Sequence, residues 1–88
     1  MVSKVVKITN PTGLHLRSAG DLCREAVKFQ CSVTFEYDGK NTANAKSVLN
    51  VLGACVKTGD EIKLICDGED EEEALAFLVA FLEDGLEA

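Results

Sequence analysis

The residues best suited to chemistry lie in one short stretch, Thr12-Gly13-Leu14-His15-Leu16-Arg17-Ser18. It holds the one histidine among 88 residues, His15. An imidazole changes protonation near neutral pH and can act as a nitrogen nucleophile. Arg17 follows where a helical pattern begins, and an arginine beside a helix N-terminus favours a bound anion. A lone histidine on an exposed turn is more often an ordinary surface residue, so the rest of the chain must decide between the two interpretations.

Length and composition predict a single domain over residues 1–88. Hydrophobic residues make up 47% of the chain, which is enough for a packed core and argues against disorder. No apolar run is long enough to cross a bilayer. The stretch from Met1 to Lys7 lacks the apolar core and cleavage site of a signal peptide. We therefore expect a cytoplasmic protein.

The charge distribution excludes some classes of partner. The formal net charge is −6, and residues 69–73 are all acidic. Binding of nucleic acid or of an anionic membrane requires clustered Lys and Arg, so we expect neither. The same composition, without exposed aromatic stripes, argues against a small RNA-binding domain. Basic residues in the middle of the chain form a patch that could steer an acidic partner protein: Arg17, Arg24, Lys28, Lys46 and Lys57.

Four cysteines, Cys23, Cys31, Cys55 and Cys66, include no Cys-x-x-Cys pair, and the histidine is not at ligand spacing from any of them. A zinc site, a metallochaperone or a redox dithiol is therefore not indicated, and we expect no metal and no cofactor. In a reducing compartment these cysteines are expected to be free thiols that behave as small hydrophobic residues.

The hydrophobic periodicity predicts seven elements. Alternation indicates strands over residues 2–9, 32–37, 40–44 and 61–67, with side chains facing the core at Val6, Ile8, Val33, Phe35, Tyr37, Ile62, Leu64 and Cys66. Residues 10–13 form a turn, and Asp38-Gly39 is typical of a tight hairpin. A helix is predicted over residues 17–29, with its core stripe at Ala19, Leu22, Cys23, Ala26 and Val27.

Two further helices complete the pattern. The first begins after Ser47 as N-cap and runs to about Leu52, before Gly53. The last begins with Asp70 as N-cap, in a capping box with Glu73, and its core stripe comprises Ala74, Leu75, Leu78, Phe81 and Leu82. The order β-α-β-β-α-β-α predicts an α+β domain in which helices cover one face of a sheet.

Four blocks of the chain together resemble the HPr family, the histidine-containing phosphocarriers of the bacterial phosphoenolpyruvate:sugar phosphotransferase system. The blocks are Gly13-Leu14-His15-Leu16-Arg17, Glu36-Tyr37-Asp38-Gly39-Lys40, Asn44-Ala45-Lys46-Ser47-Val48 and Gly68-Glu69-Asp70-Glu71-Glu72-Glu73-Ala74. The resemblance covers nearly the whole length. It implies an open-faced β-sandwich, with a four-stranded antiparallel sheet and three helices on one face.

The resemblance also implies a function. A carrier of this family is not an enzyme; it takes a phosphoryl group from enzyme I and passes it to the IIA component of a sugar permease. His15 matches the family's phosphorylated histidine and Arg17 its neighbouring arginine. The backbone amides of Leu16, Arg17 and Ser18 would stabilise the phosphate. We expect His15 to be exposed and the protein to be a monomer.

One residue departs from the family pattern within this block. The family usually has proline after the arginine, at the start of the helix, where this chain has Ser18. Because serine is less rigid than proline, we expect a modest change in loop order and transfer rate.

Ser47 matches the serine that an ATP-dependent HPr kinase modifies in many Gram-positive bacteria, and it can equally be a plain N-cap. The resemblance places a partner-docking patch around it. The expected docking residues are Arg24, Lys28, Lys46, Val48, Leu49 and Leu52. An HPr kinase/phosphorylase and a catabolite-control transcription factor are the further partners implied.

Two alternative functions stay open. One is a regulatory HPr-like binding module of carbon catabolite repression; family members of that kind lack the active histidine, so His15 and Arg17 argue against it. The other is a phosphocarrier of a non-sugar branch, such as a dihydroxyacetone kinase or nitrogen-linked system. The block around Ser47 favours the carbon-regulated branch over this alternative.

Overall fold

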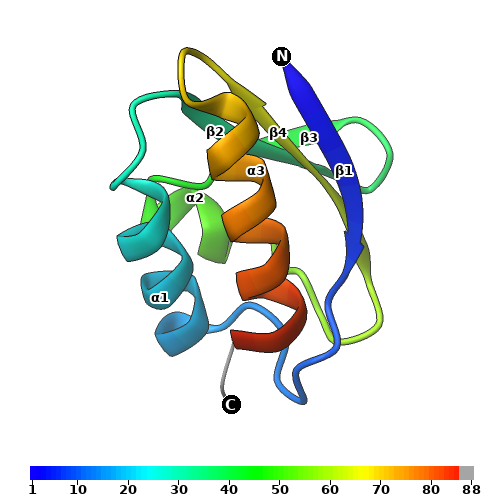
Figure 1. The fold of residues 1–88 in the computed structure, drawn as a ribbon. Helices are drawn as coiled ribbons and strands as arrows, with labels where there is room; N and C mark the ends of the chain where they lie inside the picture. The colour runs from blue at the N-terminus through cyan, green and yellow to red at the C-terminus, as the bar shows by residue number, and fades with distance from the viewer. Residues whose placement is uncertain (86–88) are drawn as a thin grey trace.

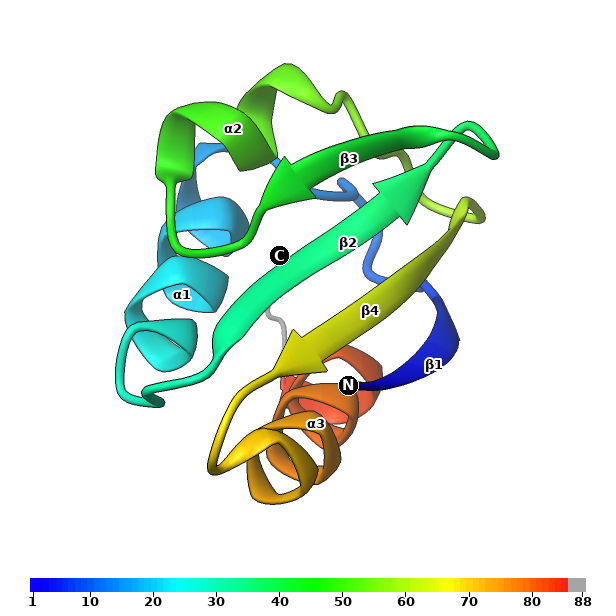
Figure 2. The same ribbon diagram turned by 90° about the horizontal axis from the view of Figure 1, so that it is seen from above.

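The sheet and its helices lie in two layers (Figures 1 and 2). The structure is a computed structural model that describes residues 1–85. Its elements are β1 (Val2–Lys7), α1 (Leu16–Ala26), β2 (Ser32–Tyr37), β3 (Asn41–Asn44), α2 (Val48–Gly53), β4 (Glu61–Asp67), α3 (Glu71–Ala80) and the π-helical turn η1 (Phe81–Gly85). The strands follow the order β1-β4-β2-β3, and every neighbouring pair is antiparallel. The predicted open-faced β-sandwich is confirmed.

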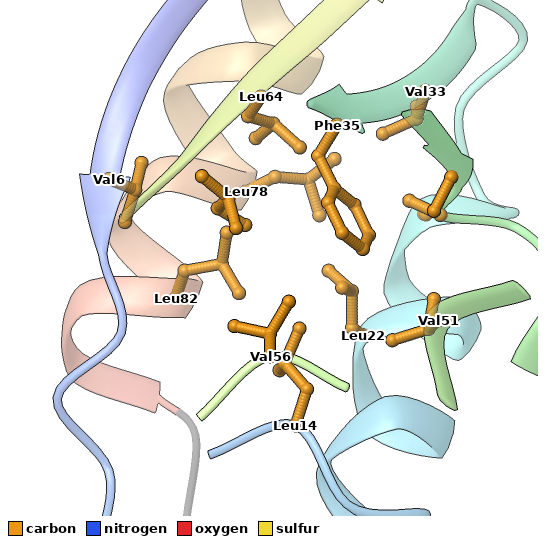
Figure 3. Packing of buried hydrophobic residues seen from close by; sticks show 14 of the residues in the cluster. Val6, Leu14, Leu22, Val33, Phe35, Val51, Val56, Leu64, Leu78 and Leu82 are labelled. Carbon is orange, nitrogen blue, oxygen red and sulfur yellow. The ribbon is translucent and has the colours of Figure 1, made fainter. Parts of the chain in front are cut away.

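The core lies between the sheet and the helices (Figure 3). Alternate strand residues such as Val6, Phe35 and Leu64 point toward Leu22 of α1 and Leu78 of α3, and all five are at most 1% exposed. Complete burial of such a side chain stabilises the fold by about 1.5–3 kcal/mol. The period-2 and helical patterns of the sequence therefore identify these five core residues correctly.

Some predicted boundaries and faces differ from the structure. β1 ends at Lys7, although Ile8 continues the ladder through a bond from its N–H to the Asp60 carbonyl at 2.8 Å. α1 begins at Leu16 and ends at Ala26, earlier than predicted, because the chain turns there toward β2. Val27 is 53% exposed and so does not belong to the core stripe. Further residues predicted to face the core are only partly buried: Cys23, Tyr37, Leu75 and Phe81.

The β2–β3 hairpin forms at the predicted place. Asp38 and Gly39 both have positive φ angles, 55° and 81°. Such angles suit the right-handed twist of the strands on either side of a tight turn. The turn brings Tyr37 opposite Asn41.

The predicted capping box between Asp70 and Glu73 is wrong. Asp70 is the N-cap residue of α3, but its side chain makes no capping bond. Its two carboxylate oxygens instead accept hydrogen bonds from the backbone N–H groups of Gln30 and Cys31, at 2.9 and 2.8 Å. These bonds, led by the one from Gln30, lower the pKa of the Asp70 carboxyl. Asp70 therefore ties the start of α3 to the connection between α1 and β2.

All four cysteines are free thiols, as expected. Cys31 and Cys66 are buried in the core, as suits small hydrophobic residues, whereas Cys23 is half-buried and Cys55 is exposed. Within residues 1–85, none of the helices has the length and apolar character needed to cross a membrane.

Candidate functional site

The loop before α1 is held in a single path by close backbone contacts. Gly13 has φ +66°, and a Cβ atom there would lie 2.6 Å from the carbonyl oxygen of Val56. That same carbonyl accepts the N–H of Leu14 at 3.0 Å, and the Leu14 side chain is only 4% exposed. Since only glycine tolerates both the angle and the close approach, Gly13 fixes where His15, two residues later, emerges.

His15 is the N-cap residue of α1. Its backbone is extended, with φ −105° and ψ −172°, and its Nδ1 accepts the N–H of Arg17 at 3.4 Å. The other ring nitrogen, Nε2, is shielded from solvent and has no hydrogen-bond partner among the described residues. The ring as a whole is half-buried, so the expectation of an exposed histidine is wrong. An Nδ1 that accepts a hydrogen bond carries a lone pair, and this places the ring proton on Nε2.

Ser18 supplies the second half of this cap. It is the third residue of α1, not the first, and it is completely buried. Its hydroxyl accepts the N–H of His15 at 3.0 Å and donates to the carbonyl of Gly13 at 2.9 Å. Asn10 donates its side-chain Nδ2 to the same carbonyl at 2.6 Å. The expectation that serine makes this loop less rigid is therefore wrong, because the Ser18 hydroxyl holds the loop through its bonds to His15 and Gly13.

Asn10 and the capping role of Ser18 were not identified from the sequence. Ser18 stands three residues after His15, which is the spacing of a capping box. The signal was hidden because histidine is not among the usual N-cap residues.

Leu16 and Arg17 project from the first turn of α1 into solvent. Leu16 is 69% exposed, and Arg17 is also exposed. Among the side chains of residues 1–83, none forms an ion pair with Arg17. A free guanidinium, together with the amides of a helix N-terminus, forms an arrangement that can hold the oxygens of a phosphate.

Ser47 is the N-cap of α2, as predicted. Its hydroxyl accepts hydrogen bonds from the backbone N–H and the side-chain Nδ2 of Asn50, at 3.3 and 3.2 Å. The side chain of Leu49 is 81% exposed, whereas Val48 and Leu52 are half-buried. α1 and α2 pack side by side, and each exposes a leucine from its first turn. Leu16 is thus an apolar surface residue that the sequence-based docking set omits.

The three basic residues of the expected docking set are engaged within the chain. Arg24 pairs with Asp21 at 2.9 Å, and Lys28 pairs with Glu25 at 3.0 Å. The Lys46 ammonium donates to the carbonyl of Phe29 at 2.7 Å, near the end of α1. Exposed pairs of this kind contribute little stability, so Arg24 and Lys28 can exchange them for a partner. Lys46, in contrast, would have to give up its hydrogen bond to the Phe29 carbonyl in order to contact a partner.

Within residues 1–85, no three His, Cys, Asp or Glu side chains come together in a way that could hold a metal ion. The groups that the site offers are an imidazole nitrogen, a guanidinium and the amides of a helix N-terminus.

Residues 2–84 match the family described as "PTS HPr component phosphorylation site". The chain is 42% identical to the HPr-like protein Crh of Bacillus subtilis over 84 residues, which cover 96% of this chain and 98% of Crh. It is 41% identical to the phosphocarrier protein HPr of Mycoplasma capricolum over 68 residues, which cover 77% and 75% of the two chains.

Its fold is similar to that of HPr from Thermoanaerobacter tengcongensis, with a TM-score of 0.90, 37% identity, and coverage of 94% of this chain and 92% of that one. A structure of the Thermoanaerobacter HPr as a dimer is also similar, with a TM-score of 0.77, 35% identity and full coverage of both chains. The family thus includes dimers, and the expected monomer stays a prediction for this chain.

Proposed function

The chain belongs to the HPr family, and from that premise we propose that it is a phosphocarrier of the phosphotransferase system. In this proposal His15 accepts a phosphoryl group from phospho-enzyme I and donates it to the IIA component of a sugar permease, in the cytoplasm. The observation that carries the proposal is the orientation of the His15 ring. Its Nδ1 lone pair is directed at the amide-rich first turn of α1.

The transfer proceeds at Nδ1. The Nδ1 lone pair attacks the phosphorus atom in line; a new N–P bond forms as the donor's N–P bond breaks, and the donor nitrogen keeps its electron pair. The His15 Nε2 proton stays in place, so the phosphorylated ring carries one positive charge, which is shared by its two nitrogens and lies beside the negative phosphoryl group. The Arg17 guanidinium and the amides of Leu16, Arg17 and Ser18 neutralise the phosphoryl oxygens. Positioning and charge stabilisation are the main requirements of such a step.

Docking of the protein partners is assigned to the exposed turns of α1 and α2. Leu49 is the principal apolar contact, and Val48 and Leu52 support it from half-buried positions. Arg24 and Lys28 contribute charge at the rim, where they can exchange their internal carboxylates for those of the partner. Lys46 contributes least, because its ammonium already serves the fold.

Ser47 is proposed as a regulatory phosphosite for an HPr kinase/phosphorylase. A phosphate on its hydroxyl would lie at the N-terminus of α2. It is tolerated there because the backbone N–H groups of the first turn can donate hydrogen bonds to a negative group. The added charge would stand beside Leu49 and would change docking of enzyme I and of a catabolite-control transcription factor.

A regulatory function without phosphoryl relay is the second candidate, since Crh is described as the catabolite repression HPr of Bacillus subtilis. One experiment separates the two. The intact mass of the native chain and of His15→Ala is measured after incubation with enzyme I and phosphoenolpyruvate. The relay predicts one acid-labile phosphate on the native chain only. A native chain that stays unlabelled, while a known HPr is labelled in parallel, would favour the regulatory candidate.

A further inference from the structure

Strand β1 forms one edge of the sheet and lies beside α3 (Figures 1 and 2). β1 pairs with β4 on one side only, so its other side is a free edge. α3 and β1 pack against each other, and a groove of about 370 Å³ opens between them. Neither feature takes part in the proposed relay.

The hydrogen-bonding direction along β1 follows from one bond. The N–H of Ile8 donates to the carbonyl of Asp60, so Ile8 bonds toward β4. Bonded residues alternate in an antiparallel ladder, so Val6, Lys4 and Val2 also bond toward β4. The N–H and C=O groups of the residues between them therefore point to the free edge. These residues are Ser3, Val5 and Lys7.

The groove beside this edge is apolar at its centre and acidic at its ends. Leu75, Ala76 and Val79 of α3 line its middle. Glu72 of α3 and Glu83 of the π-helical turn η1 line it at positions 11 residues apart in the chain, a separation of about 16 Å at the rise of an α-helix. Neither carboxylate forms an ion pair within residues 1–85.

The strand side of the groove carries a single charge, that of Lys4. The balance of the groove is therefore negative. An extended segment that lay along β1 would place alternate side chains in the groove, about 14 Å apart between its first and fifth residues. That span matches the separation of the two carboxylates.

We infer that this groove and edge bind an extended segment of a partner protein by β-strand addition. The segment has an aliphatic residue at its centre and a basic residue two positions away on each side. The aliphatic side chain covers Ala76, and the basic side chains pair with Glu72 and Glu83. Its backbone bonds to the free groups of Ser3, Val5 and Lys7. Backbone bonds supply affinity in this mode of recognition, and the alternate side chains supply specificity.

The test uses a seven-residue peptide with blocked ends, with lysine at its second and sixth positions, leucine at its fourth and threonine elsewhere. A matched peptide has proline at the third and fifth positions, which cannot donate ladder bonds to an antiparallel partner. Amide signals of the ¹⁵N-labelled full chain are followed in a titration, and hydrogen exchange is measured at saturation. The full chain is also examined at two concentrations without peptide.

We expect the amides of Ser3, Val5 and Lys7 to shift and to exchange at least about tenfold more slowly with the leucine peptide, and not with the proline peptide. The double variant Glu72→Lys with Glu83→Lys should weaken binding at least about tenfold. Glu73→Lys is the matched control, because it reverses an exposed charge on the same helix outside the groove. It should bind the peptide as the native chain does.

Three results would overturn the inference. Slowed exchange at the other free edge, in β3, would place the peptide elsewhere. Equal weakening by Glu73→Lys and by the double variant would reduce the effect to overall charge. Slow exchange of the β1 edge without peptide, increasing with protein concentration, would make a second copy of the chain the occupant.

Discussion

The backbone N–H of His15 donates to the hydroxyl of Ser18 at 3.0 Å, while the His15 ring accepts an N–H from the same first turn of α1. The two residues therefore cap the helix reciprocally. This relationship joins the reactive ring to the stability of the helix N-terminus. It also gives this chain, through a serine hydroxyl, the rigidity that other family members are expected to obtain from proline.

Removal of the Ser18 hydroxyl should loosen the site. Ser18→Ala leaves the His15 N–H without its partner and should lower the free energy of unfolding by about 1–2 kcal/mol. Urea unfolding at neutral pH measures the change. Ser3→Ala is the control, because Ser3 is exposed on β1. A loss as small as that of the control would mean that the hydroxyl does not hold the loop.

A charge at the tip of α2 should impair docking and spare the fold. Leu49→Asp places a carboxylate on a side chain that is 81% exposed. Phosphoryl acceptance from enzyme I should become at least about tenfold slower. Val5→Asp is the matched control, since Val5 is 54% exposed on the sheet. Equal transfer rates for the two variants would contradict the docking assignment.

The four thiols should differ sharply in reactivity. Cys55 is exposed and should react first with a small alkylating reagent. Burial raises the pKa of the Cys66 thiol to about 12 and also raises the pKa of the Cys31 thiol. Since the thiolate is the reactive form, neither should be labelled in the folded protein. Mass spectrometry of the digested protein, after brief labelling at pH 8, measures the order in which the four thiols are alkylated. Rapid labelling of Cys66 would contradict this prediction and would show that the core opens.

The Asp70 carboxylate should make the free energy of unfolding depend on pH in the acidic range. Its carboxyl has a folded-state pKa below the ordinary 3.8, so its contribution is present above that value and is lost as the pH falls through the lowered pKa. Asp70→Asn should be less stable than the native chain at pH 7, and the difference should shrink at pH 3. Denaturant unfolding at both pH values tests this, with Glu69→Gln as control. A difference that did not change with pH would contradict the assignment.

Local patterns in the sequence were sufficient to predict the layers of the fold and the position of His15. Alternation identified Val33 and Phe35 as core residues, and the position of Ser47 just before an apolar helical stretch identified it as an N-cap. What escaped prediction depends on contacts between distant residues. The Asp70 carboxylate does not cap its own helix; it accepts hydrogen bonds from the amides of Gln30 and Cys31, about 40 positions away in the chain.

The candidate site follows the same division. The residue types and spacing of His15 and Arg17 predict a site for phosphate, and the family match supports that prediction. The sequence did not reveal the half-buried His15 or the buried Ser18, because burial depends on residues that are distant in the chain, as the close approach of Gly13 to Val56 illustrates. Burial of a loop residue is a property of its neighbours in space.

The central claim is that the Nδ1 of His15 carries the phosphoryl group. Its most direct test is NMR of the ¹⁵N-labelled chain after phosphorylation by enzyme I and phosphoenolpyruvate, with long-range proton correlations that assign the two ring nitrogens. We predict phosphorus coupling at Nδ1, with the proton retained on Nε2, and no phosphorus signal from His15→Ala. Coupling at Nε2, or a phosphorylated His15→Ala, would contradict the account.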